Sequence, residues 1–198
     1  MECSYFGKCG SCTLYRLDYE DQIISKKEAI TTLFESLYQG SFDFFPSQDS
    51  HYRSRAEFRL WKEGDTLSYA MGAADKKSTL CIDACPKVDL KIAVLMPELL
   101  KAIESSSILR EKIFSIEFLC TSEHLLVTLL YHKPLHVAWD EEAKILEQRF
   151  GIGIIGRSRG IKRVLSRDFA EECLEIAGRT YRYRVFEGGF SQPNRAIN

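Results

Sequence analysis

The chain has 198 residues, which is enough for one domain with an appendage or for a small domain plus part of another. Hydrophobic residues make up 45% and charged residues 28%, a balance that excludes a disordered chain and favours a folded core. The formal net charge is -1, so bulk charge does not indicate a polyanionic partner, and any nucleic-acid surface must be a local patch.

The first third of the chain reads as a helix followed by a hairpin. Residues 14–38 place apolar side chains on one helical stripe, and Gly40 is a plausible stop. Residues 51–61 alternate with period two, which predicts a strand. A turn at 62–65 would then return the chain in a partner strand at 66–72.

The remaining elements alternate between helices and short strands. Residues 90–105 are helical in pattern, and Pro97 indicates a break or a new first turn there. Further runs predict a second hairpin (114–121 and 125–131), a helix (137–149) and short strands (152–155, 162–165 and 181–186). The mixture predicts an α+β fold: a mixed or antiparallel sheet of hairpins with flanking helices, preceded by a cysteine-rich loop and a helix.

Seven cysteines are many for a chain of this length, and their number is odd. Cys3, Cys9 and Cys12 open the chain on a short glycine-containing loop, and the C-x2-C pair allows two sulfurs to face one centre. A metal centre would take its fourth sulfur from Cys85 or Cys81. Four thiolates suit either a tetrahedral zinc ion or an iron–sulfur cluster, and spacing does not choose between them.

The thiols admit two other interpretations. Cys120 and Cys173 stand apart and are expected to be ordinary buried cysteines. A redox C-x2-C pair usually lies at the strand-to-helix turn of a βαβ unit, and the pattern shows no such unit.

The N-terminus has no leader-like segment, and no apolar run approaches the roughly 20 residues of a membrane span. We therefore expect a cytoplasmic protein that contacts no membrane.

The strand at 51–61 carries an unusual density of arginine. Strand periodicity puts one set of side chains on a core face (Tyr52, Ser54, Ala56, Phe58 and Leu60) and the other set on the opposite face (His51, Arg53, Arg55, Glu57, Arg59 and Trp61). Guanidinium groups beside an indole match a surface that binds phosphates and stacks bases. A solvated polar face is the competing interpretation. A second basic stretch at 157–163 could extend such a surface or merely aid solubility.

The segment 151–156 satisfies the glycine pattern G-x-G-x-x-G of dinucleotide-binding turns. That pattern binds phosphate only between a strand and the N-terminus of a helix. Here a helical run precedes it and a strand or basic loop follows. We interpret it as a helix C-terminal glycine followed by a strand.

Four segments in order, 51–59, 130–133, 155–157 and 190–194, resemble landmarks of the tRNA (uracil-5-)-methyltransferases. The resemblance covers the chain from about residue 14 to its last residue. It implies an enzyme that uses S-adenosylmethionine to methylate carbon 5 of the T-loop uridine in tRNA. It also implies that Arg59 and Phe114 lie near the target nucleotide and that Gln192 touches S-adenosylmethionine. With the arginine-rich strand, the expected RNA surface comprises Arg53, Arg55, Arg59 and Phe114.

The cysteines qualify this resemblance. Cys3, Cys9, Cys12 and Cys85 look like the four ligands of a 4Fe–4S cluster in the related rRNA uracil-5 methyltransferases, and zinc is the alternative metal. The sequence thus combines a tRNA-type body with an rRNA-type cysteine set. We expect a monomer whose partner is tRNA, with 23S rRNA as the alternative substrate. A stand-alone metal-cluster RNA-binding module is the alternative function.

The family mechanism uses a cysteine nucleophile and a glutamate base, both of which are expected beyond Asn198. The chain as given is therefore expected to be inactive by itself, and neither Cys120 nor Cys173 is assigned the nucleophile's role. The expected organisation is a cluster-binding loop and helix at 1–40, a central α+β RNA-recognition domain at 41–186, and the start of a methyltransferase domain at 187–198.

Overall fold

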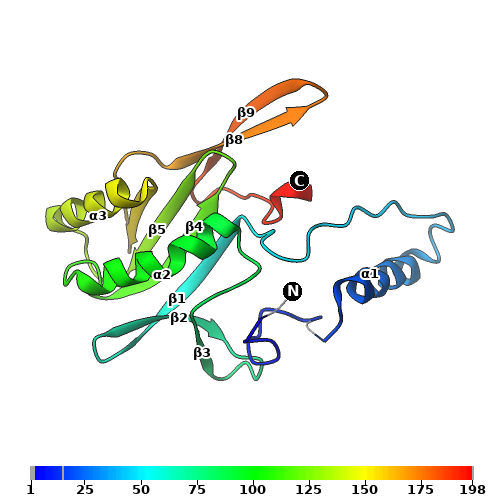
Figure 1. Cartoon of the computed structure of the whole chain (residues 1–198), viewed down its shortest axis with the longest axis horizontal. Helices are drawn as coiled ribbons and strands as arrows, with labels where there is room; N and C mark the ends of the chain where they lie inside the picture. The colour runs from blue at the N-terminus through cyan, green and yellow to red at the C-terminus, as the bar shows by residue number, and fades with distance from the viewer. Residues whose placement is uncertain (1–2, 15, 198) are drawn as a thin grey trace.

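The computed structural model describes residues 3–14 and 16–197, so positions 1, 2, 15 and 198 of the expected segments lie outside it. The helices are α1 (Tyr19–Phe34), α2 (Leu90–Ser105), α3 (Val137–Phe150) and the 3₁₀ turn η1 (Arg195–Ile197). The strands are β1 (Arg55–Glu63), β2 (Thr66–Gly72), β3 (Thr79–Ile82), β4 (Ile113–Cys120), β5 (Leu125–Tyr131), β6 (Gly153–Ser158), β7 (Ile161–Val164), β8 (Phe169–Ile176) and β9 (Arg179–Phe186). Figure 1 shows a twisted sheet with two helices, α2 and α3, on one face. The strand pair β8–β9 projects from one end of the sheet, and α1 belongs to an N-terminal arm.

In the described ranges, seven strands form one sheet in the order β3-β2-β1-β4-β5-β6-β7, and β8 pairs with β9 in a separate ribbon. Neighbours in the large sheet are antiparallel except β5 and β6, which run parallel. Parallel neighbours need a crossover connection, and α3 supplies it. The predicted α+β fold is confirmed. The single β5-α3-β6 unit was not expected, and it lies far along the chain from the C-x2-C pair.

Capping and long-range pairing explain where the predicted boundaries were wrong. Helix α1 begins at Tyr19 because the Asp18 carboxylate accepts a hydrogen bond from the Asp21 N–H at 2.9 Å. Strand β1 begins at Arg55, later than expected, because the backbone at Arg53 instead forms bridges to Val88 and Asn194. The sequence pattern does not predict the strands β3 and β8.

Helix α2 runs without interruption through Pro97, so the predicted break there is wrong. Leu95, Met96 and Leu99 are buried on both sides of the proline, and their packing holds the helix despite the lost backbone donor. Helix α3 ends at Phe150 and is capped by Gly151, whose φ of 63° is left-handed, and β6 begins at Gly153. The interpretation of the glycine pattern as a helix end followed by a strand is confirmed.

The main core lies between the sheet and the layer of α2 and α3. Alternate residues of the central strands point toward the helices, and the buried set includes Phe58, Phe118 and Trp139. The expected core face of β1 is confirmed at Ala56 and Phe58, which are both buried. Because side chains alternate along a strand, Arg55, Glu57 and Arg59 must lie on the other face, which we call the open face.

The ribbon of β8 and β9 closes one end of the open face. Its base packs Ala170 against Leu119, Leu126 and Ile155 in a second, smaller cluster. An ion cluster reinforces this junction, because the buried carboxylate of Glu187 accepts hydrogen bonds from Arg157 at 2.5 and 2.7 Å and lies 3.3 Å from the Lys162 Nζ.

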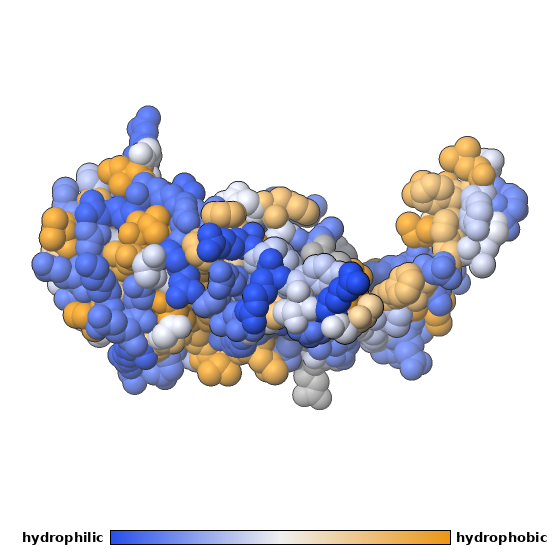
Figure 2. Space-filling model, turned by 90° about the horizontal axis from the view of Figure 1, so that it is seen from above, coloured by the Kyte–Doolittle hydropathy of each residue, from blue (hydrophilic) through white to orange (hydrophobic). Residues whose placement is uncertain are grey.

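Helix α1 stands away from the body (Figure 1), and none of its residues is buried. The space-filling view shows it as a separate arm with apolar side chains on its surface (Figure 2). Within residues 3–14 and 16–197, no helix combines the length and apolar character that crossing a bilayer requires.

Candidate functional site

An aromatic and cationic group lies on the open face beside an irregularity in β4. The register between β4 and β5 shifts between Ile113 and Ser115, and Phe114 lies in this bulge. Its ring stacks on His132, with centroids 4.4 Å apart and planes at 23°. The guanidinium carbon of Arg59 lies 5.6 Å from the centroid of the same ring. The structure thus brings together Arg59 and Phe114, two of the residues expected to bind RNA, and places His132 beside them.

A cavity of about 750 Å³ opens beside this group. The parallel pairing of β5 and β6, in which Leu130 lies opposite Arg157, brings the carboxyl ends of both strands to the same edge. The segments 130–133 and 157–159, which are separated in sequence, therefore share one site. The cavity is lined by Phe114, Leu130, Tyr131, His132, Lys133, Pro134, Arg157, Ser158, Arg159 and Ile161.

The cations around this cavity differ in how firmly they are held. The Lys133 Nζ donates to Glu111 at 2.9 Å and to the Ile108 carbonyl at 2.8 Å. Hydrogen bonding to Glu187 raises the pKa of Arg157, so its guanidinium stays protonated. Arg59 and Arg159 form no ion pair with another described residue. Two exposed guanidinium groups beside stacked rings can meet the phosphates and the bases of a single strand.

The other two predicted arginines lie elsewhere. The Arg55 guanidinium donates to Glu117 at 2.7 Å and to the Gly189 carbonyl, so it points into the protein. Arg53 lies before β1, where its backbone N–H donates to the Lys87 carbonyl at 2.8 Å. The four residues predicted to bind RNA therefore form no single row of side chains.

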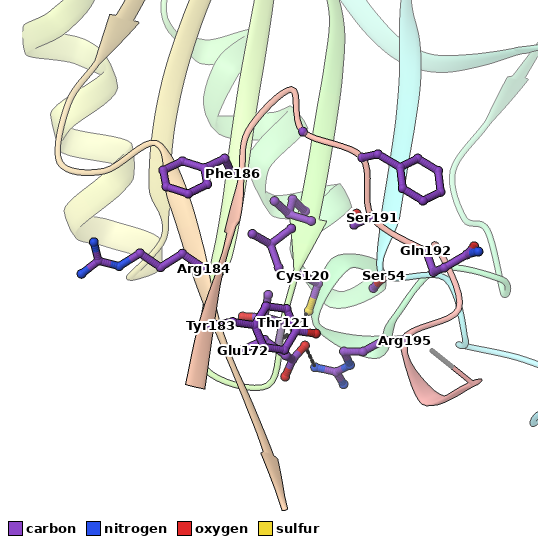
Figure 3. A pocket seen from close by; sticks show the side chains of 14 residues that line it. Ser54, Cys120, Thr121, Glu172, Tyr183, Arg184, Phe186, Ser191, Gln192 and Arg195 are labelled. Carbon is purple, nitrogen blue, oxygen red and sulfur yellow. Dashed lines mark hydrogen bonds and ion pairs between the residues drawn. The ribbon is translucent and has the colours of Figure 1, made fainter. Parts of the chain in front are cut away.

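Gln192 lies on the loop between β9 and η1, next to a cavity of about 350 Å³. Figure 3 shows its side chain pointing away from Cys120 and Glu172. The buried Glu172 accepts a hydrogen bond from the Ser122 N–H at 3.0 Å and pairs with Arg195 at 3.5 Å, the contact drawn in Figure 3.

Cys120 shares this cavity and is buried, as predicted. Burial, and to a lesser degree the neighbouring Asp89 carboxylate, raises the pKa of its thiol to about 12. Since the thiolate is the nucleophile, Cys120 stays unreactive at neutral pH. Cys173 lies in β8 and is half-buried.

Cys3, Cys9, Cys12 and Cys85 line one small cavity of about 40 Å³. The N-terminal loop reaches it by docking on the β2–β3 hairpin, where the Gly10 N–H donates to the Gly72 carbonyl at 2.9 Å. The remaining wall is largely apolar, and burial raises the pKa of the Cys85 thiol although backbone N–H groups oppose the shift.

Cys81, the rival fourth ligand, is exposed on β3 and does not line this cavity. All the cysteines are free thiols. Among residues 3–14 and 16–197, no three His, Cys, Asp or Glu side chains converge closely enough to hold a metal ion. The donor set therefore gathers around one cavity without the geometry of a bound metal.

Comparison with known proteins identifies relatives along the whole chain. The family model described as tRNA (Uracil-5-)-methyltransferase matches residues 18–198. The tRNA/tmRNA (uracil-C(5))-methyltransferase of Sulfurovum sp. is 44% identical over 200 residues, and that of Campylobacter concisus is 42% identical over 198 residues. Both alignments cover 100% of this chain and 54% of the relative, so the chain spans about half the length of these curated relatives.

The fold also matches a solved structure. The crystal structure of a Pyrococcus abyssi tRNA (uracil-54, C5)-methyltransferase in complex with S-adenosyl-L-homocysteine superimposes with a TM-score of 0.67 at 17% identity. The match covers 92% of this chain and 47% of the other. At this identity the likeness concerns the fold.

Proposed function

Since the chain belongs to the tRNA (uracil-5-)-methyltransferase family, we propose that it supplies the tRNA-recognising part of an S-adenosylmethionine-dependent enzyme. That enzyme methylates carbon 5 of the T-loop uridine. The observation that carries this proposal is the stack of Phe114 on His132, with Arg59 over the same ring, beside a cavity with a cationic rim.

The site fits a single-stranded RNA loop better than a duplex. Unpaired bases can stack on aromatic rings, whereas the bases of an A-form helix are largely hidden from side chains. The exposed guanidinium groups of Arg59 and Arg159 would meet the backbone phosphates. A uridine that is to be methylated must leave its stack, and rings that hold its neighbours favour the extruded state.

The proposal divides the chemistry between this chain and a catalytic domain. When bound, S-adenosylmethionine supplies the methyl group. Gln192 would contact it from the loop that borders the cavity of about 350 Å³. The nucleophilic cysteine and the general base are proposed to belong to the catalytic domain. Burial raises the pKa of the Cys120 thiol to about 12, which disfavours the thiolate that a nucleophile needs. The domain divisions at 1–40, 41–186 and 187–198 remain part of this proposal.

We also propose that Cys3, Cys9, Cys12 and Cys85 hold a 4Fe–4S cluster, with zinc as the alternative. Support comes from the chemistry of the donor set, because four free thiols around one largely apolar cavity suit thiolate-ligated metals. Binding would require these side chains to draw together.

Anaerobic purification followed by iron, sulfide and zinc analysis tests the metal. We expect about four iron and four sulfide per chain. Cys9→Ser should lose them, whereas Cys81→Ser, which changes an exposed thiol outside the cavity, should retain them. One zinc without sulfide would select the alternative, and no metal in the wild type would overturn the proposal.

Direct binding tests RNA recognition. A fluorescently labelled T-arm hairpin is titrated with the chain, alongside a duplex of equal length and a uridine-containing rRNA hairpin. The proposal predicts tightest binding to the T-arm. Equal affinity for the duplex would contradict recognition of the loop, and preference for the rRNA hairpin would change the assigned substrate.

A further inference from the structure

Two neighbouring residues hold the ends of the loop that carries Gln192: Ser54, which precedes β1, and Arg55, which begins it. On one side, the Ser54 N–H and hydroxyl both donate to the Pro193 carbonyl, at 2.6 and 3.0 Å. On the other side, the Arg55 Nη1 donates to the Gly189 carbonyl and lies 3.4 Å from the Ser191 Oγ. We infer that Arg55 is a positioning residue that fixes the Gly189–Gln192 loop in place for its ligand.

The surroundings of Arg55 suit this role better than contact with RNA. Its Nε donates to Glu117 at 2.7 Å, which orients the planar guanidinium, and the side chain is only 17% exposed. Its Nη2 atom is buried and forms no hydrogen bond with a described residue. A guanidinium fixed on two nitrogens and buried at the third is not offered to solvent, in contrast to the exposed Arg59.

The loop has little else to fix it between these two anchors. The Gly189 N–H closes a tight turn by donating to the Phe186 carbonyl at 3.1 Å. Phe190 is 87% exposed, so its ring does not pack into the body. What the loop binds rests on the proposed function, whereas the way Arg55 holds it does not.

Limited chymotrypsin digestion of the 198-residue chain tests the inference, because cleavage after Phe190 needs the loop to open. Cleavage after the half-exposed Tyr38, on the N-terminal arm, serves as the internal reference. We expect Arg55→Met to speed cleavage after Phe190 about tenfold or more, since charge-assisted hydrogen bonds are lost. Arg55→Lys should fall between Arg55→Met and the wild type. Arg53→Met, which removes the same charge two residues earlier, should leave the ratio unchanged.

A spectroscopic signature separates positioning from a general loss of stability. The side-chain amide resonances of Gln192 should shift in Arg55→Lys, while those of the distant Gln22 remain in place. Unchanged cleavage and unchanged Gln192 resonances in both Arg55 variants would overturn the inference.

RNA titrations on the same variants separate this inference from the proposed function. Weaker T-arm binding with a tight loop would make Arg55 an RNA contact and overturn the positioning role. If the Arg55 variants loosen the loop but the wild-type chain binds no RNA, the proposed function is wrong and the positioning role of Arg55 is still supported.

Discussion

Replacing Arg59 by alanine removes one exposed cation from the open face and breaks no ion pair with another described residue. Arg59 lies on β1 opposite Ser115, and its guanidinium carbon is 5.6 Å from the Phe114 centroid. If it neutralises one phosphate, the slope of log K against log salt should fall in magnitude by about 0.7–0.9. Loss of a charge-assisted contact of about 1.5 kcal/mol gives roughly tenfold weaker binding at low salt.

The assay is a T-arm titration at several salt concentrations, with thermal unfolding as the check on folding. Arg149→Ala is the matched control. Arg149 also lies over a phenylalanine, 4.9 Å from the Phe150 centroid, but it belongs to α3 in the helix layer behind the sheet. It should change neither the affinity nor the salt slope beyond experimental error.

Two outcomes would contradict an RNA contact at Arg59. An unchanged slope and affinity in Arg59→Ala would mean that the open face is merely solvated. Equal losses in Arg59→Ala and Arg149→Ala would mean that RNA binding follows overall charge and not this site.

Three further predictions concern the stack, the ion cluster and the sheet. Phe114→Leu should weaken T-arm binding roughly fivefold or more, because base stacking on an aromatic ring contributes about 1–3 kcal/mol, and the melting temperature should change little; unchanged affinity would remove the ring from the site. Burial raises the pKa of Glu187, but Arg157 and Lys162 outweigh it and hold that pKa below its ordinary value of 4.5. Its contribution to stability is therefore present above pH 4.5 and is lost as pH falls through the lowered value. Urea unfolding should show that the loss in free energy of unfolding caused by Glu187→Gln becomes smaller in acid. A loss that does not change with pH would contradict this. In Gly156→Ala the new Cβ would lie 2.5 Å from the Trp139 Cη2, so the free energy of unfolding should fall by about 1–3 kcal/mol, whereas Gly72→Ala, with nothing within 4 Å, serves as the control.

The central fold could be predicted because local patterns and long-range packing agree there. The β1–β2 hairpin, the β4–β5 hairpin and helices α2 and α3 all follow from periodicity, with small shifts in boundaries. The parallel pairing of β5 with β6 could not be predicted, since it depends on how α3 crosses the sheet. That pairing creates the cavity beside Phe114.

The candidate site was only partly visible in the sequence. Alternation correctly separated Phe58 from Arg59, but the same alternation placed Arg53 and Arg55 in one row with Arg59. Arg53 instead lies before the strand, and Arg55 pairs with Glu117 across it. A period-two pattern gives the face of a strand and not the partner of each side chain.

His132 was missed as an individual site residue. The segment 130–133 was recognised as a landmark, but no local signal indicated that the ring would meet Phe114, because the bulge at Ile113–Ser115 places it there. A histidine and a phenylalanine 18 positions apart become neighbours only through the β4–β5 register.

Photocrosslinking can show directly whether the RNA loop binds beside Phe114 and His132. T-arm hairpins carrying 4-thiouridine at single loop positions are irradiated with the 198-residue chain, and the crosslinked peptides are identified by mass spectrometry. Recognition of the loop at this site predicts that crosslinks concentrate on the peptides that contain Phe114 and His132. Crosslinks confined to α1 or to the β8–β9 ribbon, with none at Phe114 or His132, would contradict it.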